Sequence, residues 1–125
     1  MAEQMTIEIE GSRRAFSPGD TLAGRVNWTL EHDPTSAELR LFWYTAGKGT
    51  QNVGVQNTIS FDRPTLNERR DFRMILPNAP YSCSGSLVSI VWALELIVEP
   101  GGLTERVNIT LAPGGHEVIL ANTAI

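Results

Sequence analysis

The side chains best suited to catalysis in this 125-residue chain are two histidines and a single cysteine. A hydrolytic triad needs a nucleophile, a base and a group that orients the base. His32 stands beside a turn proline and His116 follows a glycine pair, so we expect both in exposed loops. Cys83 lies in a stretch rich in Pro, Ser and Gly, where packing at a strand entry explains it better than a reactive thiol does. We therefore predict that the protein is not an enzyme.

Metal binding is not indicated either. One cysteine and two distant histidines exclude the usual zinc spacings. Asp62, Glu68 and Asp71 are spread over a stretch that lacks the calcium-loop pattern. We predict neither a metal nor a cofactor.

Two weaker patterns could still carry chemistry. Carboxylates among Glu95, Glu99 and Glu105 could converge in space as the catalytic pair of a glycoside hydrolase. A place on the solvent-exposed face or at the end of a strand explains Glu95 and Glu99 more simply. Residues 47–50 superficially resemble a phosphate-binding loop, but the glycine and the hydroxyl residue of that motif are missing from their places. A hairpin tip accounts for the glycines there.

Aromatic side chains offer a different kind of site. Three tryptophans fall on the apolar faces of expected strands, where core packing is the common outcome: Trp28, Trp43 and Trp92. A small-ligand or carbohydrate-binding sandwich would need exposed rings instead. The rings best placed for that alternative are Tyr44, Phe42 and Tyr81.

Composition and charge restrict the class of protein. A hydrophobic content of 42% with 19% charged residues argues against disorder, and 125 residues suit one domain. The net charge of −4 argues against a nucleic-acid partner, despite the basic pairs Arg13-Arg14 and Arg69-Arg70. The N-terminus lacks the layout of a signal peptide, and the longest apolar run, residues 87–98, is too short to cross a bilayer. We expect a cytoplasmic protein without an integral membrane segment.

The dominant hydrophobic period is two, which is typical of strands with one buried face. Turn residues separate the alternating stretches, and no long segment has a period of 3.6. About eight strands are expected, at residues 6–10, 21–30, 37–45, 53–61, 72–76, 86–99, 106–111 and 117–120. This pattern predicts an all-β fold, an antiparallel β-sandwich of the immunoglobulin-like type.

Two segments resemble the arrestin fold, specifically its N-terminal-type domain. The first is FSPGDTLAGRV at residues 16–26, which resembles the aromatic-x-Pro-Gly-Asp-x-apolar-x-Gly-x-Val turn and strand of that superfamily. The second is PYSCSG at residues 80–85, which resembles the Pro-x-Ser-aromatic-x-Gly segment, with Cys83 in place of the aromatic residue. Pro18-Gly19 suits a tight turn, and Gly24 suits a close backbone approach within a strand.

The resemblance implies a single arrestin-like domain over residues 1–125, of the kind found in sporulation-control and vacuolar-sorting relatives. Those proteins usually carry two such domains, so a stand-alone domain would suit a bacterial protein. The resemblance further implies a non-enzymatic adaptor or scaffold that binds another protein. Receptor and clathrin binding cannot be carried over, because the chain lacks the segments that would support them.

The predicted binding surface is an exposed sheet edge that accepts a strand from the partner. The stretch 53–61 is polar, contains Gly54 and reads as an edge strand. The residues proposed for the interaction are Val53, Val55, Asn57, Ile59, Phe61, Arg69 and Arg70. A homodimer that imitates the two-domain arrangement of arrestins is a second possibility.

Overall fold

The computed structural model describes residues 3–47, 51–85 and 88–119. Apart from two 3₁₀ turns, η1 (Glu10–Ser12) and η2 (Pro113–Gly115), their regular structure is all strand. The strands are β1 (Gln4–Ile9), β2 (Ala15–Phe16), β3 (Thr21–Thr29), β4 (Ser36–Gly47), β5 (Val53–Ser60), β6 (Asn67–Ile75), β7 (Cys83–Ser84), β8 (Val88–Glu99), β9 (Leu103–Leu111) and β10 (Val118–Ile119). Within these ranges no helix has the length and apolar character needed to cross a membrane.

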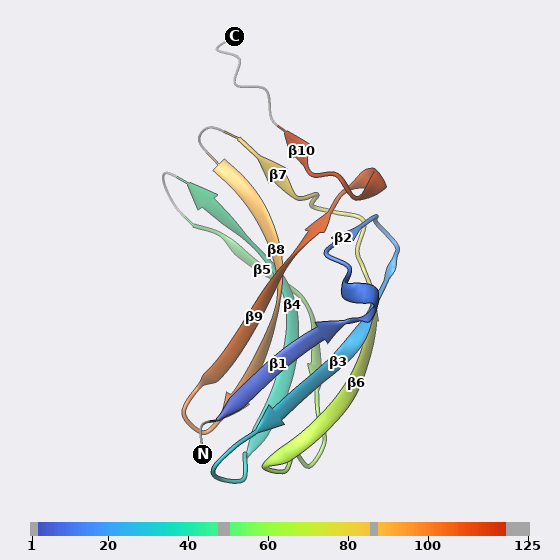
Figure 1. The fold of residues 1–125 in the computed structure, drawn as a ribbon. Coiled ribbons are helices and arrows are strands. Elements are labelled where there is room, and N and C mark those ends of the chain that lie inside the picture. The colour runs from blue at the N-terminus through green and yellow to red at the C-terminus, as the bar shows by residue number, and fades with distance from the viewer. Residues whose placement is uncertain (1–2, 48–50, 86–87, 120–125) are drawn as a thin grey trace.

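Two sheets form the sandwich (Figure 1). The small sheet has the order β1-β3-β6 and is antiparallel throughout. In the large sheet, β5, β4, β8 and β9 pair in that order, all antiparallel. The short strands β7 and β10 extend it beside the start of β8, and β2 pairs in parallel with the end of β9. The predicted all-β sandwich is confirmed.

The core follows from the period-two pattern of the long strands. Inward residues of β3 and β8 are almost completely buried, and Trp28 and Trp92 are the largest of them. Each indole N–H finds an acceptor, because Trp28 donates to the Thr65 carbonyl at 2.6 Å and Trp92 to the Pro80 carbonyl at 2.7 Å. The prediction that these two tryptophans belong to the core is confirmed, and Trp43 packs against the core while half-buried.

The turn at residues 17–20 has the form that its sequence predicts. Gly19 adopts φ +84°, and the Asp20 amide donates to the Ser17 carbonyl at 3.0 Å. The Asp20 carboxylate in turn accepts the Ser17 amide at 2.9 Å and pairs with Arg13. These contacts, the Ser17 amide first and Arg13 next, lower the pKa of Asp20. The turn also docks on the end of β6, where Gly19 and Asp20 exchange backbone hydrogen bonds with Leu76.

The second motif segment meets the first at the end of β9. Ser82 is buried; its amide donates to the Leu111 carbonyl, and its hydroxyl oxygen accepts the Leu111 amide at 2.8 Å. On the other side of β9, Phe16 pairs with Leu111, and the Ala112 amide donates to the Phe16 carbonyl at 3.0 Å. The two segments that carry the arrestin resemblance therefore flank the same residue.

Several strand boundaries differ from the prediction. β6 begins at Asn67, before the apolar alternation that predicted a strand from residue 72. Arg69, Asp71 and Arg73 lie opposite outward-facing residues of β3, and Glu68 and Arg70 pair with each other near the end of the sandwich. These charged residues extend the strand without adding to the core. β9 likewise begins at Leu103, in a hairpin after Pro100-Gly101-Gly102. The expected strand at 117–120 is described only up to Ile119, and residues 86, 87 and 120 lie outside the described part of the chain.

Gly24 is required where β1 passes β3. A Cβ at this position would collide with the Glu8 carbonyl oxygen and would lie 3.0 Å from both Ile9 Cα and Phe72 Cζ. We expect Gly24→Ala to lower the free energy of unfolding by about 2 kcal/mol, because backbone and a core ring would have to shift. Urea denaturation would measure this, with Ala23→Ser as the control, expected within about 0.5 kcal/mol of the parent. An unchanged midpoint for Gly24→Ala would contradict the close approach.

Candidate interaction edge on the large sheet

β5 is an outermost strand of the large sheet. Among the described residues it pairs with β4 alone, so its other side carries backbone groups with no strand partner. Its residues, 53–60, include no charged side chain and no proline. Natural proteins usually protect such edges with charges or prolines. The β6 edge of the small sheet shows that protection, because β6 carries five charged residues: Glu68, Arg69, Arg70, Asp71 and Arg73.

The outer face of β5 is apolar near its start. Val53 lies opposite Tyr44 and Val55 opposite Phe42, so the four side chains share the face that points away from the small sheet. Val53 is 64% exposed and Val55 57%. An edge without charged residues or proline, with two exposed valines on one face, is therefore available to an extended segment.

A β-bulge lies in the middle of this strand. The register with β4 passes from Leu41 opposite Asn57 to Phe42 opposite Val55, which leaves Gln56 as an extra residue. The bulge moves the outward positions from odd numbers before it to even numbers after it. Thr58 therefore lies on the same face as Val55, opposite Arg40.

Gly54 has a local reason that the sequence did not show. A Cβ on Gly54 would overlap the Trp43 indole, which lies against the Gly54 backbone. The glycine thus allows the ring to cover the inner face of the edge strand. Trp43 thus covers the inner side of the β4–β5 hairpin at Gly54, whereas Val53 and Val55 on the outer side are exposed.

Arg106 from β9 covers the two aromatic rings of β4 on the outer face. Its guanidinium lies 4.9 Å from the Phe42 ring centroid and 5.5 Å from that of Tyr44, and the two rings stack at 6.0 Å. Glu95 of β8 holds the guanidinium at 3.1 Å. Phe42 is only 7% exposed, so it offers no free ring to a carbohydrate. No pattern in the sequence predicted that Arg106 would reach these rings.

The remaining predicted residues of the 53–61 segment differ in their exposure to solvent. Asn57 is exposed on β5, whereas Ile59 is half-buried and packs against the core. Phe61 follows the strand and is buried, with its ring 5.9 Å from that of Trp28. A partner added to β5 could reach Asn57 but not the Phe61 ring.

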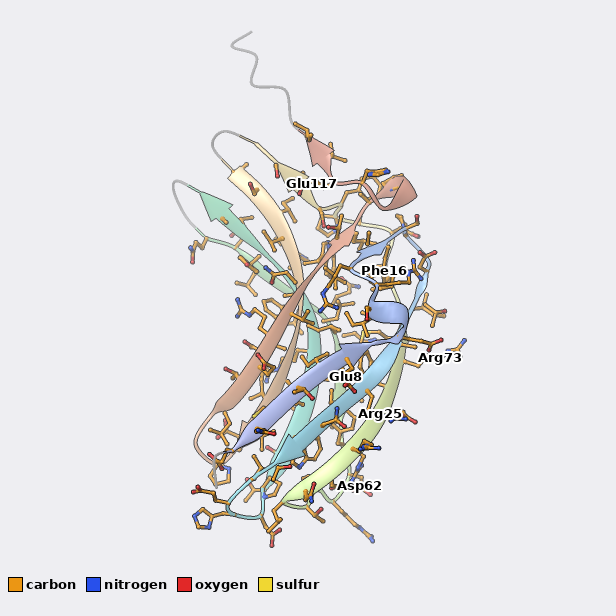
Figure 2. The ribbon with its side chains drawn as sticks, in the orientation of Figure 1. Glu8, Phe16, Arg25, Asp62, Arg73 and Glu117 are labelled. Carbon is orange, nitrogen blue, oxygen red and sulfur yellow. The ribbon has the colours of Figure 1, made fainter. Side chains whose placement is uncertain are left out.

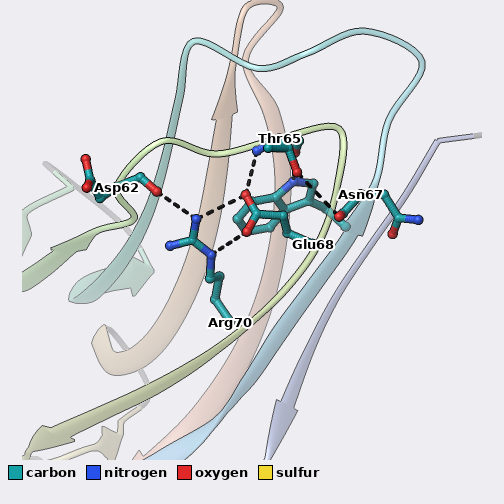
Figure 3. Close-up of polar contacts among 6 residues, drawn as sticks. Asp62, Thr65, Asn67, Glu68 and Arg70 are labelled. Carbon is teal, nitrogen blue, oxygen red and sulfur yellow. Dashed lines mark hydrogen bonds and ion pairs between the residues drawn. The ribbon is translucent and has the colours of Figure 1, made fainter.

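Arg69 and Arg70 lie on β6, in the other sheet, and have separate surroundings. Arg69 is exposed opposite Asn27, while Arg70 is half-buried. The Arg70 guanidinium binds Glu68 at 2.6 Å and the Asp62 carbonyl at 2.6 Å (Figure 3). Glu68 also accepts the Thr65 amide. Arg70 thus fastens the loop between β5 and β6.

The other groups with chemical potential do not assemble. His32 and His116 are exposed, Cys83 is buried, and no three His, Cys, Asp or Glu residues gather as metal ligands in the described ranges. Glu95 is engaged with Arg106, and Glu99 accepts the Gly102 amide at 3.3 Å. Residues 48–50 of the phosphate-loop-like stretch lie outside the described residues.

The outer face of the small sheet has a shallow hollow of about 480 Å³. Figure 2 shows Glu8, Arg25 and Arg73 on this side of the sandwich. Arg25 pairs with Asp71 at 2.9 Å, and Glu8 accepts the Asn27 side-chain amide at 3.1 Å. The charges facing this hollow largely neutralise one another, so the hollow favours no single class of ligand.

Comparisons with known proteins agree with this architecture. No protein-family model matches the chain, and neither does any curated protein. Among solved structures, the crystal structure of Spo0M, a sporulation control protein from Bacillus subtilis, is similar with a TM-score of 0.62. The similarity covers 90% of this chain and 50% of that one, at 19% identity. The chain thus spans about half the length of Spo0M, and its fold is an arrestin-like β-sandwich, as the two motif segments predicted.

The Arg70–Glu68 pair makes a prediction about acid stability. The hydrogen bond from Arg70 lowers the pKa of Glu68 below its usual 4.5 in the folded state. Stability gained from this shift is present above pH 4.5 and is lost as the pH falls through the lowered folded pKa. Glu68→Gln should therefore lower the free energy of unfolding by about 1–2 kcal/mol at pH 7, and the difference from the parent should shrink at pH 3.

Denaturation at both pH values would measure this difference. Glu31→Gln is the control, because Glu31 is an exposed carboxylate outside the described ion pairs, and it should change little at either pH. A Glu68→Gln effect that is equally large at pH 3 would show that the charge of Glu68 is not what stabilises the loop.

Proposed function

We propose that this chain is a non-enzymatic protein-interaction module, an adaptor or scaffold that takes up an extended segment of a protein partner along β5. The observation that carries the proposal is the uncharged, proline-free edge of β5 beside the exposed side chains of Val53 and Val55. Strand addition draws its affinity from backbone hydrogen bonds and its specificity from the alternate side chains of the added segment.

The arrestin-like fold supports this class of function at a coarse level only, because one sandwich architecture serves many purposes. Within the described ranges, no three His, Cys, Asp or Glu side chains gather as metal ligands, and Cys83 is buried. The cytoplasmic location and bacterial source expected from the sequence remain predictions within this proposal.

Two kinds of partner fit the same surface. Another protein and a second copy of this chain would both add a strand to β5, and Arg69 would contribute only if the partner also reached the small sheet. A small-ligand role is less well supported, because Phe42 is buried and Arg106 covers the rings of Phe42 and Tyr44. Tyr81 is 41% exposed but lies on the segment before β7.

Hydrogen exchange should distinguish the two sides of β5. In the free monomer, we expect amides of residues 53–60 that face away from β4 to exchange rapidly, because no strand covers them. Amides that bond to β4 should exchange more slowly, and addition of a bound segment should slow the outward set selectively. Uniform strong protection of residues 53–60 in a proven monomer would show that the edge is already covered.

A substitution pair tests the edge directly. Extended peptides selected by display on the parent protein should bind Val55→Lys at least about tenfold more weakly, because a lysine on an edge strand opposes strand addition. Ile75→Lys is the matched control, since Ile75 is 70% exposed but lies on β6, and its binding should equal that of the parent. Equal binding by parent and Val55→Lys would place the interaction elsewhere.

A further inference from the structure

The faces of β5 are compatible with pairing to a second copy of the same strand across a two-fold axis. When two identical strands pair antiparallel across a two-fold axis, residue i of one copy faces residue j of the other, and residue j faces residue i. Each face of the joined sheet is continuous only if i and j lie on the same face. In a regular strand this test fails whenever the two residue numbers add up to an odd number, so the bulge at Gln56 changes which registers of β5 can pass.

The central register of β5 passes the test. With the axis between Gln56 and Asn57, Val55 faces Thr58 of the second copy, and both residues are outward on the same side of the sheet. Gly54 then faces Ile59, and both belong to the inner face, where they oppose Trp43 and Leu39 of β4. The bulge makes this possible, because it shifts the outward positions from odd to even numbers halfway along the strand.

The β5 edge differs in charge from the β6 edge of the small sheet. Self-pairing of β5 brings no two charged β5 side chains together, because residues 53–60 carry none. The corresponding pairing of β6, centred on Asp71, would place Asp71 opposite itself and Arg69 opposite Arg73. Like charges directly opposite one another destabilise a strand pair. Self-association through β5 is therefore permitted where self-association through β6 is opposed.

We propose that a second copy of this chain binds at the β5 edge, in an antiparallel two-fold pair with Val55 of each copy opposite Thr58 of the other. The large sheets then join into one continuous sheet in the order β9-β8-β4-β5-β5-β4-β8-β9. This inference rests on the proposed function, since it uses the same edge and names its occupant. A foreign segment and the second copy would compete for the edge.

Disulfide trapping tests the register. Val55 and Thr58 are both exposed in the monomer. In the proposed pair, neither residue lies opposite the same residue of the second copy, so we consider the variants Val55→Cys and Thr58→Cys. Each variant alone should therefore form no covalent dimer under mild oxidation, whereas an equimolar mixture should form a disulfide-linked heterodimer. The parent, which keeps the buried Cys83, controls for other thiol chemistry.

Sedimentation measures the association without introduced cysteines. The parent should shift from 13.7 kDa toward twice that mass as the concentration rises, Ile75→Lys should follow it, and Val55→Lys should stay monomeric. Circular dichroism of each variant confirms that a loss of association is not a loss of folding.

The outcomes separate the two proposals. A parent that stays monomeric to millimolar concentration, with no disulfide in the mixture, overturns the dimer, and peptide binding that still depends on Val55 keeps the proposed function. Asn57→Cys alone giving the only covalent dimer would overturn the register, because it would place the axis on that residue. A dimer that forms equally well in Val55→Lys would overturn the use of β5 for self-association.

Discussion

The backbone of Leu111 is the point at which two distant segments of the chain meet. On one side of β9, Ser82 uses both its amide and its hydroxyl to satisfy the Leu111 backbone, and on the other side β2 pairs around Phe16. A buried backbone group without a partner is costly, so both segments must be in place before this end of β9 can be buried. The local turn chemistry of two distant segments is thereby coupled to one strand of the large sheet.

The two sheets are connected on both sides of the sandwich. β2 carries the chain from the small sheet to the large one and back, and β1 comes to lie beside β9 (Figure 1). On the opposite side, the Arg70–Glu68 pair and the Trp28 indole fasten the loop that leads from β5 to β6. The end of β5 is thus held at Phe61, while the strand pairs with β4 on one side only among the described residues.

The outer face of the large sheet shows how burial and charge can combine without making a catalytic site. Phe42 and Tyr44 would form an exposed aromatic pair, but the Arg106 guanidinium lies over both rings and is itself neutralised by Glu95. Such cation–π contacts stabilise an exposed surface modestly. They leave Val53 and Val55 as the exposed apolar side chains of this neighbourhood, which concentrates the candidate interaction surface on β5 itself.

The amino-acid sequence by itself determined the features that depend on neighbours along the chain. The alternation in β3 and β8 placed Trp28 and Trp92 in the core, Pro18-Gly19 set the turn, and Gly24 marked a close backbone approach, because period, φ preference and side-chain size are local properties. The tertiary structure alone decided what depends on residues far apart. It buried Phe61 against Trp28, engaged Arg70 with Glu68 and Asp62, brought Arg106 to Phe42, and set the bulge that fixes the faces of β5. Those outcomes follow from register between strands, which no single stretch of sequence encodes.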